Sequence, residues 1–90
     1  MNQGRESCIL EVAASATSVG HEDFYRRWQE AMMAFPGARP HWGEFFSPDR
    51  AIGDRYPELA AFEEVRARFD PDKKLLNPAL ATVLSALESR

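Results

Sequence analysis

The stretch Ser-Cys-Ile-Leu-Glu-Val-Ala-Ala, residues 7–14, decides the fold class that the sequence predicts. Its side chains are mostly apolar, it contains the β-prone residues Ile9 and Val12, and it is too short to make a good helix. We therefore expect one strand here, buried on most sides. A single strand cannot satisfy its own backbone groups, so unless another strand lies in the loop over residues 37–56, this one needs a sheet that the rest of the sequence does not supply. The sequence thus predicts the end of a larger α+β domain.

Three helices are expected after this strand. The first covers residues 21–35, with aromatic side chains at helical spacing and acidic residues in its first turn. The second begins at Pro57, a residue suited to a first helical turn, and ends before the Asp-Pro pair at residues 70–71. The third has Asn77 as its N-cap and Pro78 at its first helical position.

Composition and charge restrict the function. The net charge is −3 with no basic cluster, which argues against a nucleic-acid partner. Charges interrupt every apolar stretch well before the roughly 18 residues of a membrane span. The single cysteine, Cys8, excludes an internal disulfide and fits a reducing compartment, so we expect a cytoplasmic location, compatible with peripheral membrane association. We expect Cys8 to be buried in the strand. His21 and His41 are isolated in sequence, so no metal site is predicted.

The irregular segment over residues 37–56 is the candidate functional region. Loops of this length are usually functional or disordered, and its aromatic residues argue against disorder. Its densest cluster of chemically capable side chains is the run Arg39-Pro40-His41-Trp42-Gly43-Glu44. Pro40 stiffens the backbone, and Gly43 lets it bend close to a ligand or to another backbone. His41 can exchange a proton near neutral pH, and Trp42 offers a flat surface for a ring system.

Structural roles would explain the same residues. Arg39 can form an ion pair with a surface carboxylate, His41 can be a hydrogen-bonded structural imidazole, and Trp42 can belong to the core. Composition and spacing alone leave both interpretations open.

The run Arg39-Pro40-His41-Trp42-Gly43 resembles the Arg-Pro-His-Trp-Gly-Lys motif near the C-terminus of the aldonolactone oxidase family. This family includes D-arabinono-1,4-lactone oxidase, L-gulonolactone oxidase and alditol oxidase, and belongs to the vanillyl-alcohol-oxidase-type flavoproteins. The resemblance covers about residues 7–84. Later residues agree with the family in order and spacing: Tyr56-Pro57, the run Phe62 to Arg68, Phe69-Asp70-Pro71 and Lys74 to Pro78.

The resemblance implies a two-domain enzyme that oxidises an aldono-1,4-lactone or an alditol by hydride transfer to FAD. In such an enzyme an N-terminal domain binds the cofactor, and a C-terminal cap domain, an antiparallel sheet with helices, covers the flavin and shapes the substrate pocket. Residues 1–90 correspond to part of the cap domain, and the FAD-binding domain is absent. The partners implied are therefore an FAD-binding domain or subunit and a sugar-lactone or polyol substrate. We expect the isolated chain to hold no FAD and to be inactive.

The same resemblance assigns roles within the loop. His41 and Glu44 occupy the catalytic positions, and Arg39, Trp42 and Gly43 occupy cofactor-binding positions. Glu44 departs from the family, which has a lysine there. A lysine near the flavin N1 edge would stabilise the negative charge that develops on reduction, whereas a carboxylate opposes it unless it is protonated or turned away.

Two other functions compete with this interpretation. A small non-catalytic interaction module could use the apolar strand and helix faces to bind a partner. A small hydrolase could use His41 with Ser47, but no oxyanion-hole signature accompanies that serine.

Overall fold

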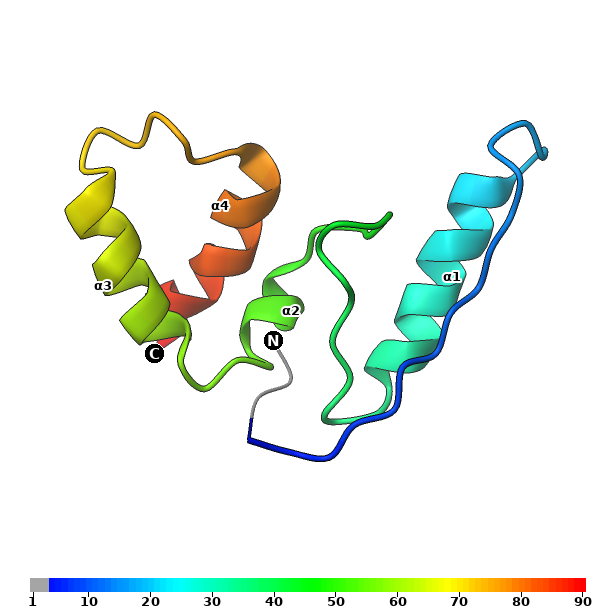
Figure 1. The fold of residues 1–90 in the computed structure, drawn as a ribbon, viewed down its shortest axis with the longest axis horizontal. Helices are drawn as coiled ribbons and strands as arrows, with labels where there is room; N and C mark the ends of the chain where they lie inside the picture. Colours follow the sequence, from blue (N-terminus) through cyan, green and yellow to red (C-terminus); the bar gives the residue numbers. More distant parts are fainter. Residues whose placement is uncertain (1–3) are drawn as a thin grey trace.

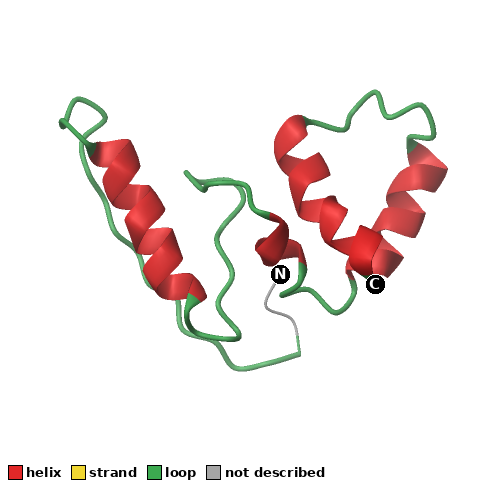
Figure 2. Ribbon diagram, turned by 180° about the vertical axis from the view of Figure 1, so that it is seen from behind, coloured by secondary structure: helices red, strands yellow, loops and turns green. Residues whose placement is uncertain are grey.

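The computed structural model describes residues 4–90, which fold into short helices joined by loops (Figure 1). The helices are α1 His21–Met33, α2 Arg50–Gly53, α3 Leu59–Phe69, α4 Pro78–Leu84 and the 3-10 helix η1 Ser85–Ser89. In Figure 1, α1 stands at one end of the molecule, α3 and α4 stand at the other, and α2 lies between them. Figure 2 shows helices and loops only over the part of the chain that is described.

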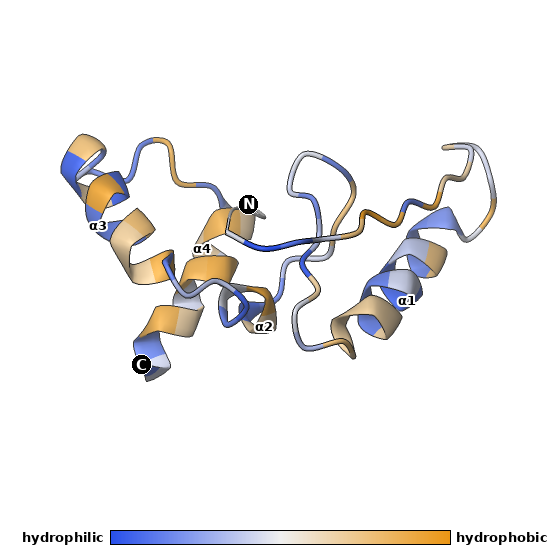
Figure 3. Cartoon of the chain, turned by 60° about the horizontal axis from the view of Figure 1, so that its bottom comes forward, coloured by the Kyte–Doolittle hydropathy of each residue, from blue (hydrophilic) through white to orange (hydrophobic). Residues whose placement is uncertain are grey.

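The predicted strand over residues 7–14 is wrong, and so is the α+β class that rested on it, because residues 4–90 contain no strand. The segment instead runs extended beside α1 (Figure 1), and Figure 3 colours part of it strongly hydrophobic. Ile9 is 78% exposed and Leu10 is 57% exposed, and Cys8 is exposed rather than buried.

The physical reason is that β-propensity describes how a residue fits a pleated, half-buried surface, and a strand forms only against a neighbouring strand. Residues 4–90 offer no such neighbour, so the segment is held by side chains. The Tyr25 hydroxyl accepts a hydrogen bond from the Ala14 backbone N–H at 2.8 Å.

The predicted third helix is confirmed at its start. The Asn77 side chain accepts a hydrogen bond from the Leu80 backbone N–H at 2.8 Å, and Pro78 lies in the first turn. The other helix boundaries differ slightly from prediction. Helix α1 ends at Met33, two residues earlier than expected, and α3 begins at Leu59 rather than at Pro57.

Helix α2 was not predicted. Asp49 is its N-cap, with a side-chain oxygen that accepts a hydrogen bond from the Ala51 N–H at 2.8 Å. The helix is only four residues long, yet it carries Ile52, which is completely buried. A single helical turn is too short to show apolar periodicity in the sequence, so the sequence pattern does not reveal this helix.

The core lies where α2 meets α4 and η1. Its buried residues are Ile52, Leu59, Val83 and Ala86. Partly buried side chains surround them: Met33, Trp42, Phe46, Tyr56, Leu84 and Leu87. This core is small. Its partly buried residues include Trp42, which belongs to the run from Arg39 to Glu44, and Tyr56, whose ring contacts Trp42. None of the helices within residues 4–90 has the length and apolarity needed to cross a membrane.

Candidate functional site

The candidate loop, residues 39–44, lies between α1 and α2 and divides into an inward-facing part and an exposed part. Arg39 and Trp42 are partly buried, whereas His41, Gly43 and Glu44 are exposed. The structure therefore places all of the sequence-predicted site residues on one short loop, but it directs their side chains to different surroundings.

Arg39 and Trp42 both pack on Tyr56, the last residue of the candidate region over residues 37–56, which was not among the predicted site residues. The Arg39 guanidinium carbon lies 4.5 Å from the centre of the Tyr56 ring, which is a cation–π distance. The Trp42 and Tyr56 rings meet edge to face, with centroids 5.5 Å apart and an interplanar angle of 73°. Arg39 and Trp42 therefore anchor the loop to the core.

Burial raises the pKa of the Tyr56 phenol, and the positive charge of Arg39 opposes that shift. Neither the Trp42 indole N–H nor the Tyr56 hydroxyl has a hydrogen-bond partner within residues 4–90. Tyr56 thus stays neutral at physiological pH and acts through its ring.

Gly43 fixes the orientation of the His41 ring. The Gly43 backbone N–H donates a hydrogen bond to His41 Nδ1 at 3.0 Å. A Cβ at position 43 would lie 2.9 Å from His41 Cε1, so a side chain there would push the ring away. Because Nδ1 accepts this bond, a neutral His41 carries its proton on Nε2. The loop thus presents an exposed N–H donor.

Glu44 follows at the end of the same turn, where its backbone N–H donates to the His41 carbonyl oxygen at 3.4 Å. Its side chain is exposed, like that of His41. An exposed carboxylate can accept hydrogen bonds from hydroxyl groups of a polar ligand, and an exposed imidazole N–H can donate one.

Two polar clamps hold the chain on either side of the loop. The Gln29 side chain in α1 donates to the Ser47 carbonyl oxygen at 2.7 Å and accepts from the Ser47 N–H at 2.8 Å. Arg55 donates to the carbonyl oxygens of Met33 and Phe35, at the end of α1. These bonds satisfy backbone groups at a helix terminus and in a loop that would otherwise lack partners.

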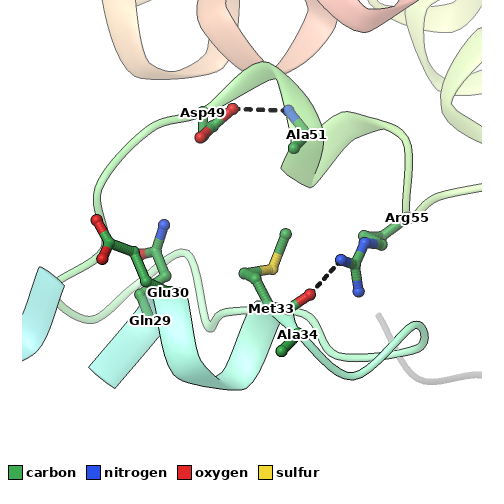
Figure 4. A pocket seen from close by; sticks show the side chains of 7 residues that line it. All are labelled: Gln29, Glu30, Met33, Ala34, Asp49, Ala51 and Arg55. Atoms are coloured by element: carbon green, nitrogen blue, oxygen red, sulfur yellow. Dashed lines mark hydrogen bonds between the residues drawn. The ribbon is translucent and has the colours of Figure 1, made fainter. Parts of the chain in front are cut away.

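A cleft of about 370 Å³ opens between α1 and α2 (Figure 4). It is lined by Gln29, Glu30, Met33, Ala34, Asp49, Ala51 and Arg55. None of the candidate loop residues lines it. Its Gln29, Asp49 and Arg55 side chains bond to backbone groups.

The model of the D-arabinono-1,4-lactone oxidase family matches residues 1–83. The chain belongs to this family. The match confirms the resemblance drawn from the His-Trp motif and from the later Asp-Pro and Asn-Pro pairs.

Two L-gulono-1,4-lactone dehydrogenases of Mycobacterium tuberculosis, from strains CDC 1551 / Oshkosh and ATCC 25618 / H37Rv, are each 35% identical over 82 residues. The aligned region covers 90% of this chain but 19% of each relative. The chain therefore spans about a fifth of the length of these family members. No solved structure matches the chain significantly.

Proposed function

We propose that this chain is the part of an FAD-dependent oxidoreductase that covers the flavin and contacts the substrate, an aldono-1,4-lactone or an alditol. The observation that carries the proposal is the exposed His41, oriented by Gly43 on a loop anchored to the core, in a member of the D-arabinono-1,4-lactone oxidase family. A loop that presents an oriented donor from a rigid support is suited to positioning a substrate.

We propose that the residues of this chain form one wall of a flavin site rather than a complete cofactor site. Tight phosphate binding needs a cradle of backbone N–H groups at a glycine-rich loop or helix N-terminus. The glycines with positive φ within residues 4–90 are Gly4 and Gly20, and they lie outside the candidate loop. We therefore propose that an FAD-binding domain or subunit holds the cofactor, and that His41 and Glu44 face it. The flavin would supply the acceptor for the hydride that leaves the sugar C–H bond.

His41 would act first as a hydrogen-bond donor. Its Nδ1 accepts from Gly43, so its Nε2–H can bind a hydroxyl or carbonyl oxygen of the sugar. Removing a hydride from an alcohol carbon also releases the hydroxyl proton. For His41 to accept that proton, the ring would have to give up its present tautomer, so the geometry favours orientation of the substrate as its role.

Glu44 would set the local charge. A carboxylate near the flavin disfavours the negative charge that develops on reduction, and thus opposes hydride transfer relative to a lysine at this position. Its exposed side chain can also accept hydrogen bonds from sugar hydroxyls, so Glu44 would contribute to substrate binding.

A charge reversal tests this assignment in an enzyme reconstituted by fusing the chain to the FAD-binding domain of a close relative. At an effective dielectric constant of about 20, a unit charge about 4 Å away is worth on the order of 4 kcal/mol. If a quarter of this remains after screening, Glu44→Lys should raise the rate of flavin reduction about fivefold. His41→Ala should lower kcat/KM in the same fusion enzyme. Stopped-flow absorbance of the flavin measures both effects.

The matched control is Glu88→Lys, which changes the charge equally on an exposed residue of η1. It should leave the rate of flavin reduction nearly unchanged. If Glu44→Lys and Glu88→Lys behave alike, Glu44 does not face the flavin and the site assignment is wrong.

A second candidate function is a non-catalytic interaction module. The observation that favours it is the large exposed apolar side chains near the end of α3, where Phe69 is 82% exposed and Leu75 is 85% exposed. A chain that folds as a clean monomer without flavin, and whose fusion enzyme is indifferent to His41→Ala, would support this alternative.

A further inference from the structure

The backbone of Tyr56 is fixed by three parts of the chain. Its N–H donates to the Gly53 carbonyl oxygen of α2 at 3.1 Å. Its carbonyl oxygen accepts from the Leu59 N–H of α3 at 3.2 Å and from the Arg90 side chain at 3.2 Å. Because these hydrogen bonds fix the Tyr56 backbone, its side chain has a defined position against which a neighbouring loop can pack.

The Tyr56 ring contacts the candidate loop on both sides of His41. Arg39 lies over the ring face and Trp42 meets the ring edge to face. These two contacts are three residues apart in sequence, and they leave His41 exposed between them. The loop backbone at His41 is therefore held from both sides, while Gly43 sets the angle of the imidazole ring.

We propose that Tyr56 is a positioning residue for His41, acting by holding Arg39 and Trp42 on its ring. The aromatic ring of Tyr56 makes these contacts, and its hydroxyl has no hydrogen-bond partner within residues 4–90. The consequence for substrate turnover rests on the proposed function, whereas the consequence for the loop does not.

Trp42 fluorescence tests the proposal in the 90-residue chain. The chain has two tryptophans, so Trp28→Phe leaves Trp42 as the only one and serves as the parent. In this parent, Tyr56→Leu should expose Trp42 and raise its acrylamide quenching constant severalfold, because both ring contacts are lost. Tyr56→Phe should match the parent, because the ring contacts remain.

Two further variants separate positioning from general loss of stability. Leu80→Ala removes an apolar side chain from the cleft between α3 and α4, away from the loop, and should leave Trp42 quenching unchanged in the folded state. Arg39→Gln keeps the Tyr56 ring and should raise the quenching constant by a smaller factor than Tyr56→Leu; it also provides the test if Tyr56→Leu does not fold. The proposal is overturned if Tyr56→Phe behaves like Tyr56→Leu, or if Leu80→Ala exposes Trp42 equally.

The fusion enzyme adds a double-mutant cycle. Tyr56→Leu should lower kcat/KM on the order of tenfold in the presence of His41, and should have little further effect in His41→Ala, because Tyr56 acts through that residue. Equal losses in both backgrounds would overturn positioning through His41. If the fluorescence results hold while His41→Ala itself leaves turnover intact, the proposed function fails and Tyr56 remains the residue that holds the loop.

Discussion

Gly53 lies where α2 packs against α4 and η1, and the absence of its side chain allows that contact. A Cβ built at this position would lie 2.2 Å from the Val83 carbonyl oxygen and 2.7 Å from the Ala86 Cβ. The first of these atoms belongs to the backbone of a helix and cannot rotate away. Gly53 is therefore a packing residue, which separates it from Gly43, where the neighbouring atoms belong to the His41 ring.

Gly53→Ala should destabilise the fold by about 3 kcal/mol, the upper part of the range for overpacking a core. Alanine gains about 1 kcal/mol over glycine in helix propensity, but a clash with a backbone atom outweighs that gain. Urea unfolding followed by circular dichroism measures the difference. Gly37→Ala is the control, since its Cβ would meet only the end of the flexible Arg5 side chain at 3.0 Å. Equal stability of the two variants would show that Gly53 is not tightly packed.

At the scale of the element, α3 is stabilised at its C-terminal end by a partly buried ion-pair network. Arg66 donates to both carboxylate oxygens of Glu63, at 2.6 and 2.8 Å, and its side chain is only 11% exposed. It also lies 3.8 Å from Asp70, whose carboxylate accepts the backbone N–H groups of Lys74 and Leu75. This network connects α3 to the loop that leads to α4.

The network predicts an acid-sensitive contribution to stability. The hydrogen bonds from Arg66 lower the pKa of Glu63, so the folded state favours the ionised carboxylate. The contribution of this pair to the free energy of unfolding is therefore fully present above the ordinary glutamate pKa. It is lost as the pH falls through the lowered pKa of Glu63. Thermal melts at a series of pH values should show a smaller acid-induced drop in Tm for Glu63→Gln than for the original chain.

The control is Glu64→Gln, which removes an exposed carboxylate that lies 4.0 Å from Arg68. An exposed pair at this distance contributes little to stability, so this variant should retain the acid response of the original chain. If Glu63→Gln and Glu64→Gln respond alike to acid, the Glu63–Arg66 pair does not stabilise α3 in solution.

At the scale of the whole molecule, the apolar surface exceeds what the small core can bury. Large hydrophobic side chains are exposed on the N-terminal segment, on α3 and after its end: Ile9, Leu10, Phe62, Val65, Phe69 and Leu75. Figure 3 colours stretches of the N-terminal segment and of the helices α3 and α4 as hydrophobic. Exposed apolar surface of this extent is typical of a surface that contacts another polypeptide.

We therefore expect the chain, expressed by itself, to bind a hydrophobic dye such as ANS and to self-associate with increasing concentration. Replacing Phe69 and Leu75 together by serine should reduce dye fluorescence and shift sedimentation toward the monomer. Replacing the exposed but charged Glu64 by serine should do neither. A monomer that melts sharply and binds no dye would contradict the expectation that these faces require a partner.

Local features of the sequence were sufficient for the capped start of α4 and for the candidate loop. Asn77 caps through a hydrogen bond to a residue three positions away, and Gly43 bonds to a residue two positions away. The run from Arg39 to Glu44 is contiguous, so its members lie close together in any fold. Such features depend on neighbours in sequence, and residue type and spacing determine them.

Three features depend on the tertiary structure: the conformation of residues 7–14, the burial of Ile52 and the ring contacts of Tyr56. A β-prone segment forms a strand only if another strand lies beside it, and that depends on the whole chain. Ile52 is buried by Leu59, Val83 and Ala86, and Tyr56 contacts Arg39 and Trp42 across more than ten residues of intervening chain. Burial and ring contacts between residues distant in sequence arise only when the chain is folded, so spacing along the sequence does not reveal them.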